Sequence, residues 1–340
     1  MSTDATTLPQ LQGGLFLTDG GLETSLIFQE GWELPHFAAF HLLQDEAGVA
    51  ALRAYYEAYL KIAQANGLGF VLESPTWRAS ADWGDKLGYS REALAEANRR
   101  SNMLMLELRD RYAGAAPLVV SGNIGPRGDG YDPGTVMSAD EAQNYHAAQV
   151  GVHAEAGVDM VAAFTMTNAN EAVGVTRAAQ AARVPVAISF TVETDGRLPT
   201  GQGLGEAIAE VDELTRTGPA YNMHKCPHPS HFAGRLGGKA PWISRIGGIR
   251  ANASRRSHAE LNEAPDLDDG NPVELGGEYR AMLKQHPHIA VVGGCCGTTP
   301  AHIRAFAEAL AGIAPRAIPQ VPPYARLSGP EPLVIGPENT

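Results

Sequence analysis

The feature that most constrains the fold is the alternation of short apolar runs with longer segments of helical periodicity. Eight strands, most of them followed by a helical segment, over roughly 300 residues are typical of a (β/α)8 barrel. We therefore predict a single TIM-barrel domain that spans residues 1–340. The predicted strands are Leu15–Thr18, Gly69–Glu73, Pro117–Ser121, Val158–Phe164, Val186–Thr191, Tyr221–Cys226, Trp242–Ile246 and Ile289–Val292.

Helical segments fall between these strands. Ser138 is followed three residues later by Glu141, which is the capping-box pattern of a helix start. A polar segment, Arg250–Pro272, follows the seventh strand and is too long for a simple connection. The segment Pro319–Pro337 is proline-rich, which predicts a tail over about 315–340. The predicted helices cover about 45–66, 90–112, 138–156, a segment ending near 183, 204–215, 273–285 and 300–311.

A doubly wound open sheet would also alternate strands and helices, but its nucleotide-binding signature is missing. Gly201-Gln-Gly-Leu-Gly205 has the wrong spacing for that signature, and the sequence contains no P-loop. The sequence also shows no internal repeat and no linker that would divide it into two domains. The barrel is therefore the preferred fold.

Composition excludes several classes of function. The formal net charge is −12, whereas a general nucleic-acid-binding protein needs a basic face. The one local basic cluster, Arg250–Arg256, is typical of a solvated loop. No apolar run approaches about 18 residues and Met1–Gly13 lacks signal-peptide features, so we expect a cytoplasmic protein without a membrane partner. Three cysteines do not make a disulfide framework, and free thiols in a reducing compartment can bind metal.

All three cysteines fall at the ends of predicted strands. Cys226 ends the sixth strand, and Cys295 and Cys296 follow the eighth. In a closed eight-stranded barrel these two strands are one strand apart and open toward the same end. Three thiolates there suit a tetrahedral Zn²⁺ with one open position. Adjacent residues of a flat strand point to opposite faces, but Gly293–Gly294 and Gly297 allow the chain to depart from the pleat.

Other interpretations stay open from the residues alone. The cysteines can be small buried hydrophobic residues, and Cys295–Cys296 can form a strained vicinal disulfide. The segment His224-Lys-Cys-Pro-His-Pro-Ser-His231 could supply histidine and cysteine ligands by itself, although it has no partner pair with regular spacing. If the three cysteines hold zinc, we expect His228 or His231 to orient the cysteine loop or to contact substrate.

The cysteine motif is part of a wider resemblance. Gly293-Gly-Cys-Cys-Gly-Thr-Thr-Pro300, together with Cys226, is similar to the homocysteine S-methyltransferase family. The segments Thr18-Asp-Gly-Gly-Leu-Glu-Thr24, Ser121-Gly-Asn-Ile-Gly-Pro126 and Ile188-Ser-Phe-Thr191 resemble the family's motifs at strands one, three and five. The likeness covers nearly the whole chain, and it implies a zinc-dependent (β/α)8 enzyme that makes methionine.

The resemblance also implies roles for particular residues. It implies that Cys226, Cys295 and Cys296 bind zinc and that the sulfur of homocysteine takes the fourth position. Loss of the thiol proton then leaves a thiolate that attacks the methyl group of a cationic donor in line. Asp19 matches the family's acidic residue for the ammonium of homocysteine, and the Gly20–Gly21 backbone is expected to donate to its carboxylate.

The chain departs from the family in two places. Many members carry a glutamate at the end of strand four for the same ammonium, whereas Ala163-Phe-Thr-Met-Thr167 contains none. We expect Glu193, after the fifth strand, to substitute for it. Arg78 falls about where the betaine-using branch has a tyrosine, which argues against a betaine-type donor. Trp77 could instead face a sulfonium methyl group, so S-methylmethionine or S-adenosylmethionine is the favoured donor.

Two asparagines complete the predicted substrate-binding set. Asn123 and Asn252 are candidates for substrate contact, although turn formation or capping explains each equally well. The same residues fit a different thiol or selenol acceptor, and a betaine-type donor is kept as the alternative to a sulfonium donor. A corrinoid partner protein or a homo-oligomer also stays open. If the protein is not an enzyme, the alternative function is a zinc-binding scaffold or a redox sensor. In a redox sensor, oxidation joins two cysteines and expels the metal.

Overall fold

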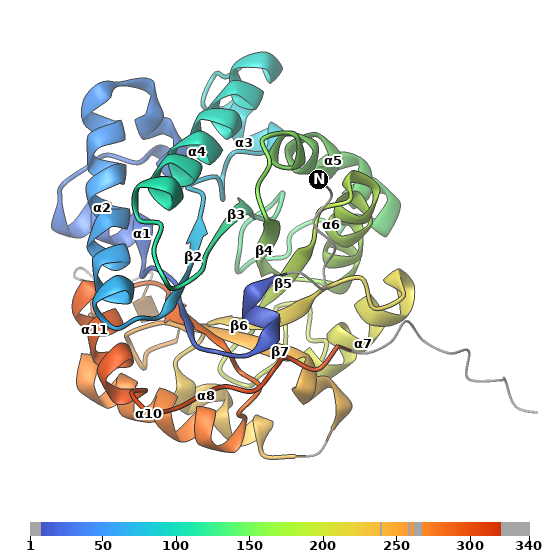
Figure 1. The fold of residues 1–340 in the computed structure, drawn as a ribbon. Helices are drawn as coiled ribbons and strands as arrows, with labels where there is room; N and C mark the ends of the chain where they lie inside the picture. Colours follow the sequence, from blue (N-terminus) through green and yellow to red (C-terminus); the bar gives the residue numbers. More distant parts are fainter. Residues whose placement is uncertain (1–7, 239, 258–259, 262–266, 321–340) are drawn as a thin grey trace, which may run out of the picture.

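The computed structural model describes residues 8–238, 240–257, 260–261 and 267–320. Its eight parallel strands pair in sequence order and β8 closes on β1, which confirms the predicted single (β/α)8 barrel. Figure 1 shows the helices as a ring around these strands. The strands are β1 (Phe16–Leu17), β2 (Gly69–Glu73), β3 (Leu118–Ile124), β4 (Met160–Met166), β5 (Val186–Thr191), β6 (Tyr221–Cys226), β7 (Ile246–Ala251) and β8 (Val291–Gly294).

Most of the helices begin where the sequence provides a cap. The side chain of Asp45 accepts the backbone N–H of Gly48 at 2.7 Å, and the capping box of Ser138 and Glu141 is present as predicted. The longer helices are α2 (Glu46–Ala65), α4 (Arg91–Arg111), α5 (Ala139–Glu155), α6 (Ala169–Ala182), α7 (Leu204–Thr215), α10 (Pro272–Gln285) and α11 (Pro300–Ala309). The shorter ones are α1 (Leu22–Thr24), α3 (Ala81–Lys86) and α8 (Pro229–Phe232).

The seventh strand lies farther along the chain than the sequence indicated. The predicted strand Trp242–Ile246 is wrong, because Pro241–Arg245 forms a 3₁₀-helix. Pro241 supplies the fixed φ of a first helical turn, and its carbonyl accepts a hydrogen bond from the Ser244 hydroxyl at 2.7 Å.

The true strand, β7, contains two consecutive glycines that weaken its pattern in the sequence. A Cβ on Gly247 or Gly248 would come close to the end of the Ile318 or Met223 side chain, so a larger residue at either position requires that neighbour to move. The predicted loop Arg250–Pro272 therefore begins after Ala251, and Arg250 belongs to the strand. This shift moves Arg250 from the solvated loop where the sequence placed it into the barrel.

One end of the barrel is filled by apolar side chains. The chain before β1 forms a 3₁₀-helix, Pro9–Gln12, which lies across the amino ends of the strands in dark blue in Figure 1. Ile318 joins it, because its N–H donates to the carbonyl of Leu11 at 3.1 Å. We call this region the closed end, formed by Leu8, Leu11, Phe16, Met160, Tyr221 and Ile318, all of them buried.

The chain beyond the last helix returns to the closed end. Arg316 donates its N–H to the carbonyl of Pro287, and the described structure ends at residue 320. Most of the predicted proline-rich tail, Pro319–Pro337, therefore lies outside the described residues. Within the described part of the chain, no helix has the length and apolar character needed to cross a membrane.

Candidate active site

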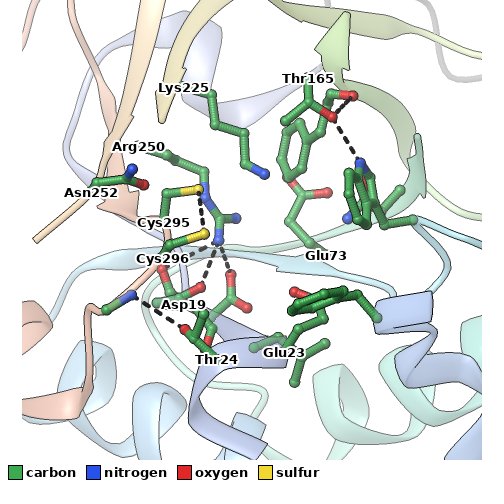
Figure 2. A pocket seen from close by; sticks show the side chains of 18 of the residues that line it. Asp19, Glu23, Thr24, Glu73, Thr165, Lys225, Arg250, Asn252, Cys295 and Cys296 are labelled. Atoms are coloured by element: carbon green, nitrogen blue, oxygen red, sulfur yellow. Dashed lines mark hydrogen bonds and ion pairs between the residues drawn. The ribbon is translucent and has the colours of Figure 1, made fainter. Parts of the chain in front are cut away.

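The three cysteines meet at the carboxyl end of the barrel, opposite the closed end. Cys226 ends β6, and Cys295 and Cys296 follow β8. The Sγ atoms of Cys226 and Cys295 lie 3.4 Å apart, and those of Cys295 and Cys296 lie 4.0 Å apart, as Figure 2 shows for the second pair. All three are free thiols, so the vicinal disulfide is not formed in this structure.

Backbone geometry turns these thiols toward one another. Cys226 has φ of +80°, a left-handed conformation that is uncommon outside glycine and is often found at functional sites. Gly297 has φ of +77° and closes the turn that carries the two neighbouring cysteines. The turn is fixed by the N–H of Cys295, which donates to the carbonyl of Ala251, and by the N–H of Gly297, which donates to the hydroxyl of Thr24.

The sulfur positions suit a tetrahedral zinc ion after a small adjustment. Zn–S bonds of about 2.3 Å in a tetrahedron place the sulfur atoms roughly 3.8 Å apart, and the two measured distances of 3.4 and 4.0 Å bracket that value. In the part of the chain that the structure describes, no three His, Cys, Asp or Glu side chains are already arranged around one metal position. Rotation of the thiol side chains is therefore needed to complete the set.

The rival ligand set within 224–231 is engaged elsewhere. The ring of His224 packs against Phe232 with centroids 3.7 Å apart. The Nδ1 of His228 accepts the N–H of Ser230, and its Nε2 lies 3.4 Å from Glu278. These contacts favour the three cysteines as metal ligands.

A cavity of about 370 Å³ lies beside Cys295 and Cys296. Glu193 lies outside it and lines a smaller neighbouring cavity with Cys226 and Asn252. The main cavity brings together six of the predicted substrate-binding residues, namely Asp19, Gly20, Gly21, Trp77, Asn123 and Asn252. Charged residues that were not predicted to bind substrate also line it, among them Glu23, Glu73, Lys225 and Arg250.

Asp19 already has a partner. Its carboxylate lies 2.7 Å from the guanidinium of Arg250 and accepts a hydrogen bond from the hydroxyl of Tyr55 at 3.0 Å. Both charges are buried, at 3% and 4% exposure for Asp19 and Arg250. Burial alone would lower the pKa of Arg250, but Asp19 and Glu73 outweigh it and the net pKa is raised. The acidic group predicted for the substrate ammonium is thus neutralised within the protein.

The glycines after Asp19 are also occupied in part. The N–H of Gly21 donates to the carbonyl of Thr298 at 3.1 Å, and the carbonyl of Gly20 accepts from Arg250 at 3.0 Å. This backbone therefore fixes the cysteine turn and Arg250. The Gly21 N–H has a partner before any substrate carboxylate arrives.

Two other acids face the cavity. Glu73, at the end of β2, is 3% exposed, and its Oε2 has no hydrogen-bond partner among the described residues. Burial raises the pKa of Glu73 to about 7, opposed by the charge of Arg250. Burial likewise raises the pKa of Glu23, and Lys225 is among the groups that oppose that shift. Figure 2 shows both glutamates and Lys225 around the same space.

Trp77 lies at the mouth of the cavity with Arg78. The indole Nε1 donates to the hydroxyl of Thr165 at 2.9 Å, and Thr165 itself has φ of +57°. The guanidinium of Arg78 lies 3.8 Å from the ring centroids of Trp77 and Trp83, and 3.6 Å from Asp129. Burial lowers the pKa of Arg78 to about 10, although Asp129 opposes the shift. One face of Trp77 is therefore covered by a protein cation.

The two predicted asparagines occupy different settings. Asn123 lies within β3, one residue before its end, and Asn252 directly follows β7. The side-chain oxygens of both are buried without a hydrogen-bond partner in the described residues, so each can accept a bond from a ligand. Tyr131, which the sequence did not single out, donates its hydroxyl to Cys226 Sγ at 3.3 Å.

The sequence profile of the homocysteine S-methyltransferase family matches residues 16–310. The chain belongs to the homocysteine S-methyltransferase family. Homocysteine S-methyltransferase 4 of Zea mays is 27% identical to it over 323 residues, covering 88% of this chain and 90% of the maize protein. Homocysteine S-methyltransferase 3 of Zea mays is 25% identical, with the same coverage. Membership in this family makes the protein an enzyme of methyl transfer.

Solved structures of the family show the same fold. The homocysteine methyltransferase MmuM of Escherichia coli, in its metallated form, aligns with a TM-score of 0.66 over 87% of this chain and 96% of its own, at 20% identity. The apo form of MmuM aligns with a TM-score of 0.62 over 90% of this chain and all of its own, at 19% identity. The family's barrel therefore extends over nearly all of the described chain.

Proposed function

We propose that the protein transfers a methyl group from a small cationic donor to the thiolate of homocysteine, giving methionine, with Zn²⁺ held by Cys226, Cys295 and Cys296. The observation that carries the proposal is the convergence of these three free thiols beside a cavity that holds both acidic and basic side chains. The metallated form of MmuM supports a metal in the family. Zinc is the metal that suits three thiolates with an open fourth position.

The chemistry requires a thiolate, because a free thiol with a pKa near about 8.5 is mostly protonated at neutral pH. Bound Zn²⁺ would supply the positive charge that keeps the acceptor sulfur deprotonated. The acceptor sulfur then forms an S–CH₃ bond while the bond from the methyl carbon to the donor's cationic sulfur breaks. The electron pair of that bond stays with the donor sulfur, so the donor leaves as a neutral thioether.

The protein's own residues prepare this step electrostatically. Hydrogen bonds with Cys226 and Cys296 lower the pKa of Cys295, and the charges of Lys225 and Arg250 act in the same direction. Three thiolates and one Zn²⁺ carry a net charge of about −1 before the acceptor adds its own. The two cations therefore stabilise the assembled centre, and the cavity aligns donor and acceptor.

The donor is proposed to be S-methylmethionine or S-adenosylmethionine. The indole of Trp77, which lines the cavity, can attract a sulfonium methyl group, and apolar side chains of the cavity, including the half-exposed Phe28 and Phe37, can pack against the rest of the donor. Arg78 lies on Trp77, which disfavours a compact quaternary ammonium such as betaine at that position. We also place the protein in a reducing, cytoplasmic compartment, since the proposed chemistry needs free thiols.

A donor screen tests this function. Reduced, zinc-loaded protein is incubated with homocysteine and with methyl-deuterated S-methylmethionine, S-adenosylmethionine or betaine, and deuterated methionine is measured by mass spectrometry. We expect product from a sulfonium donor and none above background from betaine. Product from betaine alone would overturn the donor assignment, and no methionine from any donor would overturn the proposed enzyme reaction.

One distance favours a second candidate, a redox-sensing zinc scaffold. The 3.4 Å between Cys226 and Cys295 is short enough that oxidation could join them with little movement. In that case the metal would dissociate reversibly on oxidation, and homocysteine would not bind the zinc-loaded protein. Binding of homocysteine to the reduced, loaded protein separates the enzyme from the scaffold.

A further inference from the structure

Lys225 is the residue before Cys226 in β6, and its side chain extends into the main cavity. Figure 2 shows its ammonium group in the space between the cysteines and Glu73. Among the described residues, no carboxylate lies within 4.0 Å of it, and its side chain makes no hydrogen bond to a protein group, the cysteine sulfurs included. Its Nζ lies over the ring of Phe164, 4.6 Å from the ring centroid. Phe164 lies in β4, in the segment that lacks the family's glutamate.

An ammonium group in such a place needs a negative partner. Lys225 is partly buried. An ammonium that loses part of its contact with water without gaining hydrogen bonds is destabilised, so a ligand that supplies acceptors there gains binding energy.

The other two cations of the cavity already have protein partners for their charge, although Arg250 Nη1 and Arg78 Nε have no hydrogen-bond partner among the described residues. Arg250 pairs with Asp19 at 2.7 Å and also donates to the carbonyls of Gly20 and Gly294. Arg78 lies between two tryptophan rings, pairs with Asp129 and donates to the carbonyl of Gly128. Of the three cations that line the described cavity, Lys225 is the one with no bonded protein partner.

One of the two backbone donors expected for a carboxylate is also taken. The N–H of Gly21 is bonded to Thr298, so a substrate carboxylate at that position would have to displace a bond within the protein. A carboxylate on the same short chain as the reacting thiol would instead lie near Lys225, which neighbours the metal-binding sulfurs. The ammonium of an amino-acid acceptor would then face the carboxylate of Glu73.

We infer that Lys225 binds the carboxylate of the thiol acceptor and makes that carboxylate a requirement for tight binding. This inference rests on the proposed function, because it assumes a thiol acceptor at the three cysteines. It assigns to Lys225 a specificity role that neither the family's cysteine motif nor Asp19 supplies. The ammonium also offsets the negative charge that accumulates when a thiolate acceptor joins the cysteines.

Equilibrium binding tests the inference without a methyl donor. Homocysteine and its decarboxylated analogue 3-aminopropane-1-thiol are titrated by calorimetry into zinc-loaded wild-type protein and Lys225→Met. We expect Lys225→Met to weaken homocysteine binding roughly 10- to 100-fold, the range for a charged hydrogen bond, and to change binding of the analogue less than about threefold. Lys225→Arg should recover part of the loss.

Two controls keep the result specific. Zinc content and thermal unfolding of each variant show whether the neighbouring Cys226 still binds metal and whether the barrel is folded. Lys61→Met is the matched control, since Lys61 is an exposed lysine on α2 whose ion pair with Glu57 lies outside the cavity. It should bind both thiols as the wild type does.

Three outcomes count against the inference. Equal weakening of both thiols would mean that Lys225 acts on the thiolate centre and not on a carboxylate. Unchanged homocysteine binding by a zinc-loaded Lys225→Met protein would remove Lys225 from acceptor recognition while leaving the proposed function intact. Failure of the zinc-loaded wild type to bind either thiol would overturn the proposed function itself, and the inference with it.

Discussion

The two ends of the barrel are built from the same eight strands but have opposite character. At the closed end, Leu11, Met160 and Ile318 fill the space with apolar contacts. At the carboxyl end, buried carboxyl, amide and thiol groups surround a cavity, and several of them have no hydrogen-bond partner in the described residues. Buried polar groups without partners reduce stability, so the closed end stabilises the fold while the carboxyl end retains groups that a ligand can satisfy.

The comparison predicts that removing a thiol affects function far more than folding. Cys226→Ser should lose stoichiometric zinc and lower kcat/KM for methionine formation roughly a thousandfold, because metal stabilisation of the thiolate contributes several kcal/mol. Elemental analysis and the deuterium assay measure the two effects. The thermal unfolding of the variant and of zinc-free wild type should be similar. A Cys226→Ser protein that keeps zinc and activity would contradict the assigned ligand set.

A truncation at the closed end should behave in the opposite way. Leu11→Ala removes buried apolar contacts and should lower the free energy of unfolding by about 2 to 3 kcal/mol. Zinc content should be unchanged at a temperature where the variant is folded. Met103→Ala, at an exposed position of α4, is the control and should change stability by less than about 0.5 kcal/mol. If Leu11→Ala lost zinc without losing stability, stability could not be assigned to the closed end and metal binding to the carboxyl end.

The positions of Glu73 and Glu193 predict which of the two acids contributes more to homocysteine binding. Glu73→Gln should raise the homocysteine KM roughly tenfold at pH 8, since it replaces a buried carboxylate that can accept the substrate ammonium. Glu193→Gln should leave the homocysteine KM nearly unchanged, because Glu193 lies outside the main cavity. Steady-state kinetics of both variants decide between them. The reverse ranking would restore Glu193 as the substitute for the missing strand-four glutamate.

The same glutamate predicts a pH dependence. Because burial raises the pKa of Glu73 from 4.5 in the unfolded chain to about 7, its ionised form is disfavoured in the folded protein. Its contribution to stability therefore falls as pH rises from about 4.5 through 7, and homocysteine binding should strengthen over the upper part of that range as the carboxylate forms. Urea unfolding and homocysteine titrations at pH 5.5 and 8 should show smaller pH effects in Glu73→Gln than in the wild type.

The smallest expected effect is at the cavity mouth. Trp77→Phe keeps an aromatic face but loses the hydrogen bond to Thr165, and it should raise the KM of the sulfonium donor roughly three- to fivefold. The homocysteine KM should stay the same, because Trp77 belongs to the mouth and not to the sulfur centre. A larger change for homocysteine than for the donor would place the acceptor at Trp77.

Much of the fold was readable from the sequence because parallel barrel strands are buried apolar runs. That pattern identified seven strands and the convergence of Cys226 with Cys295. It failed at β7, where Gly247 and Gly248 interrupt the apolar run, whereas the adjacent 3₁₀-helix places Trp242 and Ile243 side by side. The amino-acid composition of a strand does not show which of its positions lie close to side chains of neighbouring elements in the folded protein.

The charged groups of the cavity were harder to predict. Arg250 belongs to a basic cluster that looks solvated, yet it is buried because Asp19, far away in the sequence, neutralises it. Lys225 precedes a cysteine at a strand end, and that it faces the cavity is seen only once the strands have closed into the barrel. The placement of Glu193 depended on the path of the loop after β5, which local sequence does not determine.

The central claim is that three cysteines hold a zinc ion whose fourth position accepts a thiol. The most direct test is zinc X-ray absorption of freshly reduced protein before and after homocysteine is added. The account predicts about one zinc per chain with three sulfur ligands at about 2.3 Å, and a fourth sulfur when homocysteine binds. Absence of zinc, or a sulfur count that homocysteine leaves unchanged, would contradict it.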